Sequence, residues 1–221
     1  MGGTVARSVG RVRARCCAII LAMVTRRRMT KSDRRDQLVE VARRIVVEEG
    51  ADALTLGHLA VAAGVSKPVV YDHFGSRAGV LVALYEDYDR RQTALLVEAL
   101  DATPTSLDAQ VATVARCHVA CVLDHGAEIG GVVAALSGTP AMAEVKRGSD
   151  AAYVEICRRA FDRSAAPAAW TDAAAVAFLG AADAVSEAAL DQTITRADAE
   201  SALVDLLASQ LAPRPGARQQ H

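Results

Sequence analysis

Apolar residues recur at helical spacing through most of the chain after residue 29. Thr30 and Asp33 stand three residues apart at the start of the first such segment, in the pattern of a capping box. Apolar residues then follow at intervals of three and four from Leu38 to Ile45, as on one face of a helix. Gly50 supplies a stop, because glycine is the usual residue just past a helix end. The pattern therefore predicts a first helix between Thr30 and Gly50.

Two shorter helices are predicted directly after the first, with a tight turn between them. Thr55 can cap the earlier one, because a threonine side chain accepts a hydrogen bond from a first-turn amide. Gly64 opens the turn, and Ser66 can cap the later helix, which tolerates Pro68 because first-turn amides lack partners anyway. Three short helices in about 45 residues, the last two joined by a glycine turn, have the spacing of a helix-turn-helix.

Longer helices are predicted in the rest of the chain. Strand signals are weak, since the short β-branched runs each lie inside a helical period. Breaks in the pattern fall mainly at proline, glycine and threonine. Helices are expected over residues 77–100, 105–124, 128–136, 140–163, 167–190 and 195–211. The predicted fold class is therefore all-α.

Four segments are expected along the chain. Residues 1–29 are interpreted as a disordered basic extension or an over-called translation start, with a DNA-contacting basic arm as the functional alternative. The apolar run at residues 18–24 in this segment is far too short to span a bilayer. Residues 30–76 form the helix-turn-helix domain and residues 77–212 a larger helical domain. Residues 213–221 are rich in proline and polar residues and form a frayed tail.

Charge also divides the chain. Residues 1–80 contain 14 Lys and Arg against 7 Asp and Glu, which gives a net charge of +7. Residues 81–221 contain 11 against 19, which gives −8 and leaves −1 for the whole chain. A basic segment on an acidic body is typical of a nucleic-acid contact region, although a solvated basic face gives the same count.

The chain has five cysteines, an odd number, and no paired CxxC motif. This usage predicts reduced thiols and a cytoplasmic location rather than a disulfide scaffold. Cys117, His118, Cys121 and His125 fall within an arc of about 100° on one helix face. Such groups bind soft metal ions or react with oxidants, but free cysteine is also an ordinary core residue.

The stretch GADALTLGHLAVAAGVSKPVVYDHFGSRAGVL, residues 50–81, closely resembles the DNA-binding signature of the tetracycline-repressor-like (TetR) family of bacterial regulators. The resemblance in motif covers roughly residues 30–81, and beyond them it covers only the helical layout. It implies a three-helix DNA-binding domain followed by a larger helical domain for effector binding and dimerisation. The matching residues are Gly50, Thr55, Leu59, Ala60, Ala63, Gly64, Val65, Ser66, Tyr71, His73, Phe74, Arg77 and Leu81.

The resemblance and the physics of base reading point to the same candidate DNA contacts. A recognition helix exposes side chains to base edges in the major groove while its back face packs on the preceding helices. Lys67 can donate to a guanine and Val69 can contact a thymine methyl group. Tyr71 and His73 can hold phosphates, but each is also interpretable as a core or helix-end residue. The full set of candidate DNA-binding residues is Thr55, Ser66, Lys67, Val69, Tyr71, His73 and Arg77.

The resemblance further implies a homodimer in which the last two long helices of each subunit form a four-helix interface, so that two heads read a palindrome. Small residues around Gly180 suit close helix approach, although an intramolecular core gives the same pattern. The remaining helices would enclose a small-molecule effector. The candidate lining residues are Cys117, His118, Cys121, His125 and Met142.

The favoured function is a repressor that a small, mostly apolar ligand releases from a palindromic operator in double-stranded DNA. One alternative is a metal- or thiol-responsive regulator that uses the cysteines and histidines of residues 117–125, and another is a constitutive DNA-binding scaffold. The rival from another class is an all-helical enzyme, but the sequence has no nucleotide-binding loop, HExxH or GxSxG motif. The chain is not expected to be an enzyme, and neither a cofactor, a resident metal nor a membrane partner is expected.

Overall fold

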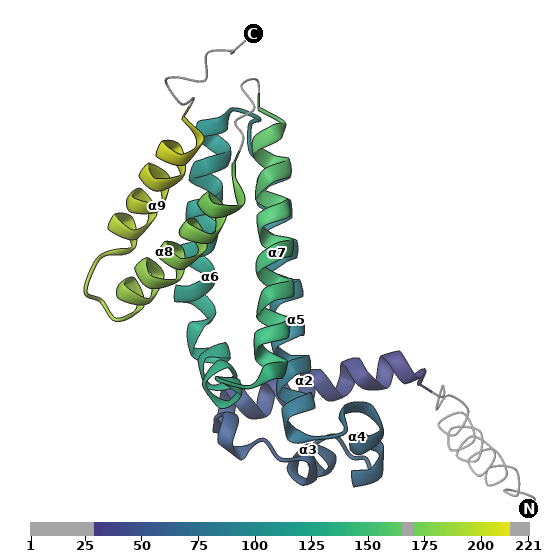
Figure 1. The fold of residues 1–221 in the computed structure, drawn as a ribbon. Coiled ribbons are helices and arrows are strands. Elements are labelled where there is room, and N and C mark those ends of the chain that lie inside the picture. Colours follow the sequence, from purple (N-terminus) through teal and green to yellow (C-terminus); the bar gives the residue numbers. More distant parts are fainter. Residues whose placement is uncertain (1–28, 165–169, 213–221) are drawn as a thin grey trace, which may run out of the picture. The chain divides into compact units, whose positions relative to one another are not determined.

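The computed structural model of the chain describes residues 29–164 and 170–212 (Figure 1). Every regular element within these ranges is a helix, which confirms the predicted all-α fold class. The chain divides into two units, residues 1–37 and 38–221. In chain order the elements are α2 (Lys31–Glu49), η1 (Ala51–Ala53), α3 (Leu56–Ala62), α4 (Lys67–Phe74), α5 (Arg77–Asp101), α6 (Leu107–Leu136), α7 (Pro140–Asp162), α8 (Asp172–Leu190) and α9 (Arg196–Leu211).

The first turn of α2 carries the predicted capping box. Oγ1 of Thr30 accepts a hydrogen bond from the Asp33 amide at 3.0 Å, and Oδ2 of Asp33 accepts one from the Thr30 amide at 3.1 Å. Arg34 donates to the side chain of Gln37 one turn later. The reciprocal bonds satisfy amides that have no intrahelical partner, so the start of this helix is defined locally.

One apolar core joins the short helices to parts of the long ones. It contains buried residues of α2, η1, α3 and α4 together with the start of α5, the end of α6 and the start of α7. The expected domain boundary at residues 76 and 77 therefore runs through a shared core. The most deeply buried members include Leu38, Leu59, Val70, Leu81, Val132 and Leu136.

A second apolar core joins the other ends of α5, α6 and α7 to α8 and α9. Trp170 packs edge-on against Phe161 and Phe178, with ring centroids 5.5 and 5.7 Å apart. Its indole Nε1 donates to Oε1 of Gln210 on α9 at 2.9 Å. Helix α6 lies between the pair α5 and α7 and the pair α8 and α9 (Figure 1).

The region predicted as two helices, residues 105–124 and 128–136, is a single helix in the structure. Helix α6 continues through it, with a bend of 85° between Leu107–Asp124 and Ile129–Leu136. Glycine weakens a helix without ending it unless the chain adopts a left-handed conformation, and the glycines of α6 do not have positive φ. One of them, Gly131, lies close to η1, where an added Cβ would stand 3.2 Å from the Cβ of Ala51.

Helix α8 begins later than the predicted residue 167. Its first residue is Asp172, and Thr171 caps it by accepting a hydrogen bond from the Ala174 amide at 3.2 Å. Residues 165–169 of the predicted helix lie outside the described residues, as do the segment 1–28 and the tail from residue 213. The cap supplies the physical reason for the start at Asp172. The Thr171 side chain accepts the hydrogen bond of the Ala174 amide, which a longer helix would give to a preceding backbone carbonyl.

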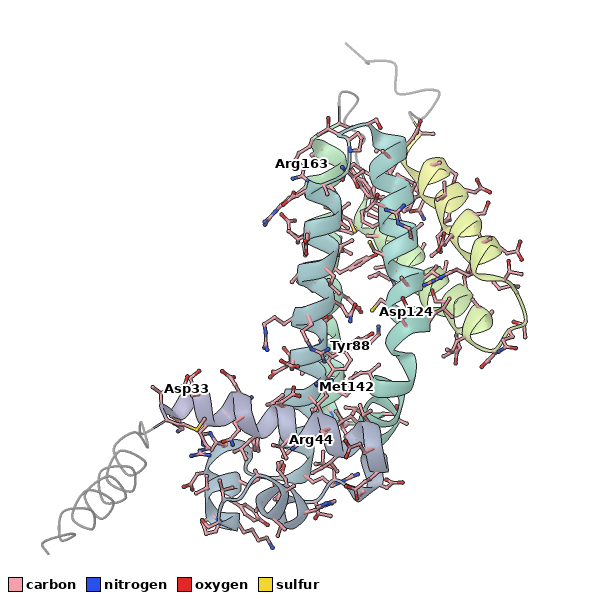
Figure 2. All side chains as sticks on the ribbon, turned by 180° about the vertical axis from the view of Figure 1, so that it is seen from behind. Asp33, Arg44, Tyr88, Asp124, Met142 and Arg163 are labelled. Atoms are coloured by element: carbon pink, nitrogen blue, oxygen red, sulfur yellow. The ribbon has the colours of Figure 1, made fainter. Side chains whose placement is uncertain are left out.

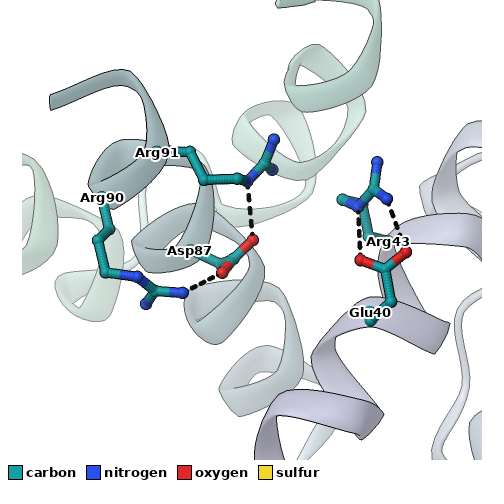
Figure 3. Close-up of polar contacts among 5 residues, drawn as sticks. All are labelled: Glu40, Arg43, Asp87, Arg90 and Arg91. Atoms are coloured by element: carbon teal, nitrogen blue, oxygen red, sulfur yellow. Dashed lines mark hydrogen bonds and ion pairs between the residues drawn. The ribbon is translucent and has the colours of Figure 1, made fainter. Parts of the chain in front are cut away.

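The exposed faces of α2 and α5 carry ion pairs within each helix (Figure 3). Arg43 donates two hydrogen bonds to Glu40, at 2.7 and 3.0 Å, and this guanidinium holds the pKa of Glu40 below its usual value. Asp87 accepts hydrogen bonds from Arg90 and, at 3.0 Å, from Arg91. Exposed pairs of this kind contribute at most about 1 kcal/mol each, so the two apolar cores account for most of the stability.

Two glycine-to-alanine substitutions should change stability in opposite directions. Gly148 is exposed inside α7 with no atom within 4 Å of an added Cβ, so Gly148→Ala should raise the free energy of unfolding by up to about 1 kcal/mol. Gly64 has a φ of 65°, so Gly64→Ala should lower it by about 1–2 kcal/mol. Urea unfolding of both variants and the wild type measures the two changes. Equal effects of the same sign would contradict the helix and turn assignments.

Candidate nucleic-acid interface

Helices α3 and α4 are joined by a turn whose hydrogen bonds are local. Thr55 accepts a hydrogen bond at Oγ1 from the His58 amide at 3.0 Å, which confirms the predicted cap of α3. After α3, the amide of Val65 donates to the carbonyl of Ala60 at 3.0 Å. Ser66 occupies the cap position of α4, but its side chain makes no capping hydrogen bond, so the predicted side-chain cap is wrong there.

Helix α4 has one buried face and one solvent-exposed face. Val70 is fully buried, and Val65 and Phe74 pack against the first core, as predicted for the back of a recognition helix. Lys67 and Tyr71 are exposed beside this buried face, and Tyr71 is 47% exposed. The Lys67 ammonium lies 5.8 Å from the centroid of the Tyr71 ring. A cation and a phenol therefore stand side by side on the outer face of a short, anchored helix.

A cleft open to solvent lies between the starts of α3 and α5 and the exposed face of α4. It brings together four of the seven predicted DNA-binding residues, which are Thr55, Lys67, Tyr71 and Arg77. The other three do not line it. Ser66 is exposed at the start of α4, and Val69 and His73 are half-buried on the same helix.

The remaining lining of the cleft comes from residues that sequence reasoning did not select, namely Leu56, Gly57, Gly75 and Ser76. A Cβ added at Gly57 would meet only Oγ1 of Thr55, at 3.9 Å. The absence of a side chain at Gly57 therefore leaves this side of the cleft open. Ser76 caps α5 by accepting a hydrogen bond from the Gly79 amide at 3.1 Å. Its position one residue before a long apolar-periodic segment is the signal that could have identified it.

Arg77 ties the start of α5 to the segment that precedes α3. Its Nε donates to the Leu54 carbonyl at 2.8 Å, and Nη2 donates to the Ala51 carbonyl at 2.7 Å. The carboxylate of Asp52 lies 3.6 Å from the same guanidinium. Two of the five guanidinium N–H groups are thus engaged on the backbone, so Arg77 holds the cleft walls together and offers its remaining donors to a ligand.

The chemistry of the cleft suits an anion. The first-turn amides of α5 have no intrahelical partners, and a helix start carries partial positive charge. Lys67 and Arg77 add full charges, while Thr55 and Tyr71 add hydroxyl donors. Phosphate oxygens are bound by this combination of groups in proteins.

Residues 38–84 match the family described as bacterial regulatory proteins of the tetR family. The match covers all of α3 and α4, most of α2 and the start of α5, which are the elements that build the cleft. Residues 38–84 therefore form a TetR-family segment of the chain. The resemblance expected from the sequence is therefore confirmed.

A curated protein and many solved structures are similar to this chain. The HTH-type transcriptional activator FasR of Mycolicibacterium smegmatis is 37% identical over 59 residues, which are 27% of this chain and 27% of FasR. The matched part thus spans about a quarter of that relative's length. A tetR-family transcriptional regulator from Streptomyces coelicolor has 22% identity and a TM-score of 0.61, with 82% of each chain covered. FadR from Bacillus subtilis, solved with stearoyl-CoA, has 16% identity and a TM-score of 0.60, with 79% of this chain and 98% of FadR covered.

The predicted effector-binding residues fall into two places. Cys117, His118 and Cys121 lie on α6 near α5 and α7, where the Tyr88 hydroxyl is 3.3 Å from the Cys121 carbonyl and 2.9 Å from its Sγ. Met142 is buried in the first core, nearer to α2, as Figure 2 shows for the labelled side chain. The side chain of His125 lies outside the described part of the chain.

The groups near His118 are kept in their uncharged forms by burial. Burial lowers the pKa of His118, an effect that the nearby Asp183 opposes. Burial raises the pKa of Cys117 and Cys121, and it raises that of Cys157 on α7 to about 12. Thiols of this kind are poor nucleophiles, and within the described residues no group of three His, Cys, Asp or Glu side chains could hold a metal ion.

Replacing Arg77 should destabilise the fold more than replacing its neighbour in the cleft. Arg77→Ala leaves the carbonyls of Leu54 and Ala51 without their donors, so we expect the free energy of unfolding to fall by about 1–3 kcal/mol. Lys67→Ala should change it by less than about 0.5 kcal/mol, because the ammonium is exposed. Urea unfolding measures both. An Arg77→Ala variant as stable as Lys67→Ala would show that the backbone bonds do not hold the cleft.

Proposed function

We propose that the chain is a homodimeric, DNA-binding transcriptional regulator in which α4 enters the major groove of a palindromic operator. A small, mostly apolar effector bound among α5–α8 releases the protein from the DNA. The proposal assigns it a regulatory role and no catalytic one. A role as repressor follows if the bound protein blocks transcription, and activation is the second candidate because the curated relative FasR is described as an activator.

The observation that carries the DNA-binding proposal is the outer face of α4 beside the cleft. Val70 anchors the helix from behind, so Lys67 is held at its exposed start, where a recognition helix meets base edges. Tyr71 and Thr55 line the cleft that suits a phosphate, and each has a hydroxyl that can donate. Base reading by Lys67 and phosphate contacts by Tyr71, Thr55 and Arg77 form one consistent docking scheme, with Ser66, Val69 and His73 as further contacts.

The homodimer is supported by the exposed face of α8. Ala173, Val176, Ala177, Gly180 and Ala184 are all exposed and recur at helical spacing, with Val176 70% exposed. Helix α8 is apolar enough by length and composition to cross a membrane, yet only 28% of its most apolar window is buried within the chain. A second copy of the same helix would cover this face, and the small residues would allow the two helices to approach closely.

An organic effector is supported by the interior of the body. The thiols near His118 have raised pKa values, which disfavours both oxidant sensing and metal binding as the trigger. FadR, which has the same fold, is known in complex with stearoyl-CoA, a molecule with a long apolar part. Cys117, His118 and Cys121 are the sequence-predicted residues that we retain for the effector site.

DNA binding should be sequence-specific and salt-dependent, and substitutions at Lys67 and Tyr71 should affect it in different ways. A duplex enriched from a random pool by the purified protein should bind with a log–log salt slope of about −0.9 for each phosphate neutralised. Lys67→Ala should cost about 1–3 kcal/mol and relax preference at one position of each half-site, because Lys67 reads a base. Tyr71→Phe should weaken binding to all sequence variants alike, because it removes only a phosphate donor. Fluorescence anisotropy against the enriched duplex and its single-base variants measures these effects.

The enriched sequences also test the proposal itself. An inverted repeat is expected, since two heads related by a two-fold axis read two half-sites. A pool without enrichment, or an affinity that does not change with salt, would contradict the proposed function. Unchanged base preference in Lys67→Ala would refute the base-reading role alone.

Gly180→Arg should convert the dimer into a monomer. The arginine would project from the apolar face of α8 and bury a charge in the interface. Gly148→Arg on α7 is the matched control, because that glycine is equally exposed and unobstructed and lies on another helix. Sedimentation equilibrium should give a monomer for Gly180→Arg and a dimer for Gly148→Arg and the wild type. A dimeric Gly180→Arg would show that the interface lies elsewhere.

A further inference from the structure

Three buried polar atoms on three helices of the body have no hydrogen-bond partner of ordinary strength. They are Nε2 of His118 on α6, the hydroxyl of Tyr153 on α7 and Oγ of Ser186 on α8. The thiol of Cys157, one turn after Tyr153, is the neighbour of the Tyr153 hydroxyl, and a thiol is a weak partner. An unsatisfied buried polar group costs about 1–3 kcal/mol, and the rings of His118 and Tyr153 are in contact, so a site with these two groups favours a ligand that pairs with them.

The surroundings of His118 are aromatic. Its ring packs edge-on against Tyr153 and Phe178, with ring centroids 5.7 and 6.2 Å apart. Its Nε2 is 3.9 Å from Oδ1 of Asp183, which is too far for a hydrogen bond. The imidazole therefore presents one polar atom among aromatic rings. A site for a mostly apolar molecule needs a few such polar groups to orient the ligand.

The charges closest to this cluster are paired with one another. Lys146 on α7 lies 3.3 Å from Asp150 on its own helix and 3.3 Å from Asp183 on α8. Burial keeps the His118 imidazole neutral by lowering its pKa, and it keeps the Tyr153 hydroxyl protonated by raising its pKa. No unpaired charge within the described cluster is thus available to neutralise a charged ligand.

We propose that His118 and Tyr153 form the polar end of the effector site, and that the effector is an uncharged, mostly apolar molecule bearing a hydroxyl or carbonyl oxygen. The Tyr153 hydroxyl donates to that oxygen, and Nε2 of His118 makes a second hydrogen bond to the same polar group. The proposal rests on the proposed function. It adds Tyr153 to the site and leaves Met142 in the first core.

The chain contains its own probe for this site. Trp170 is the single tryptophan, and its ring lies 5.7 Å from that of Phe178, which also contacts His118. A ligand beside His118 displaces or repacks Phe178 and so changes the emission of Trp170. Alkyl compounds that do not absorb in the tryptophan region are therefore suitable ligands for a titration.

The test is a titration of Trp170 emission with four eight-carbon probes: 1-octanol, 2-octanone, octanoate and octylammonium. The two uncharged probes should bind at least about tenfold more tightly than the two ions, because a charge would be desolvated without a partner. Tyr153→Phe should weaken binding of 1-octanol and 2-octanone by about five- to tenfold, as expected for one lost hydrogen bond. Tyr85→Phe is the matched control, since Tyr85 packs on the first core, and it should bind the probes as the wild type does.

Each of the following outcomes overturns the proposal. Tighter binding of either ion, no binding of the uncharged probes, or equal affinities for wild type and Tyr153→Phe would each show that the polar end of the site lies elsewhere. DNA binding of the ligand-free wild type and Tyr153→Phe, measured in parallel, separates the two levels. Intact DNA binding with any of these outcomes refutes only the effector site, whereas probe binding without DNA binding refutes the proposed function.

Discussion

Three helices of this protein, α5, α6 and α7, each place one part in one apolar core and another part in the second. The first core also contains the short helices that carry Lys67 and Tyr71, and the second contains α8 and α9. Protein cores are close-packed, so a helix cannot shift in one core without disturbing its contacts in the other. The helix-turn-helix therefore shares its core with the long helices, and its orientation depends on the positions of α5, α6 and α7.

The polar cluster lies at the second core. His118 on α6 and Tyr153 on α7 stand next to Val119 and Val154 of that core, and Tyr153 itself packs against it. The cluster leaves buried polar atoms without partners inside an otherwise apolar region. A molecule that satisfies them would stabilise one arrangement of α6 relative to α7 and α8. Gly131 of α6 lies close to Ala51 of η1, and the Ala51 carbonyl accepts a hydrogen bond from Arg77 of the cleft. A shift of α6 would therefore reach the cleft through these contacts.

Local signals made the helix-turn-helix segment predictable from sequence. Thr55, Gly64 and Val70 act through hydrogen bonds, backbone conformation or burial within a few residues of themselves, so spacing alone located the helices α3 and α4. The fold class and family were confirmed for the same reason. The two bonds from Arg77 to the carbonyls of Leu54 and Ala51 were not foreseen, because they join residues 23 and 26 positions apart.

The interior of the body was less predictable, since it depends on contacts between distant helices. Sequence periodicity placed His118 and Cys121 on one face of a helix, but nothing local indicated that Tyr153 on α7 would face His118. Met142 was predicted to line the effector pocket, and only the fold reveals that the start of α7 belongs to the first core. The bend of α6 was also read as a break, because glycine-rich sequence has the same appearance in both cases.

The central claim is that the face formed by α3, α4 and the start of α5 is the surface that binds DNA. Amide hydrogen exchange of the full-length protein, with and without its enriched duplex, tests this most directly, since it reports protection along the whole chain. The account predicts that DNA slows exchange mainly in peptides within residues 55–77. Protection concentrated in α8 and α9, or no change within residues 55–77, would contradict it.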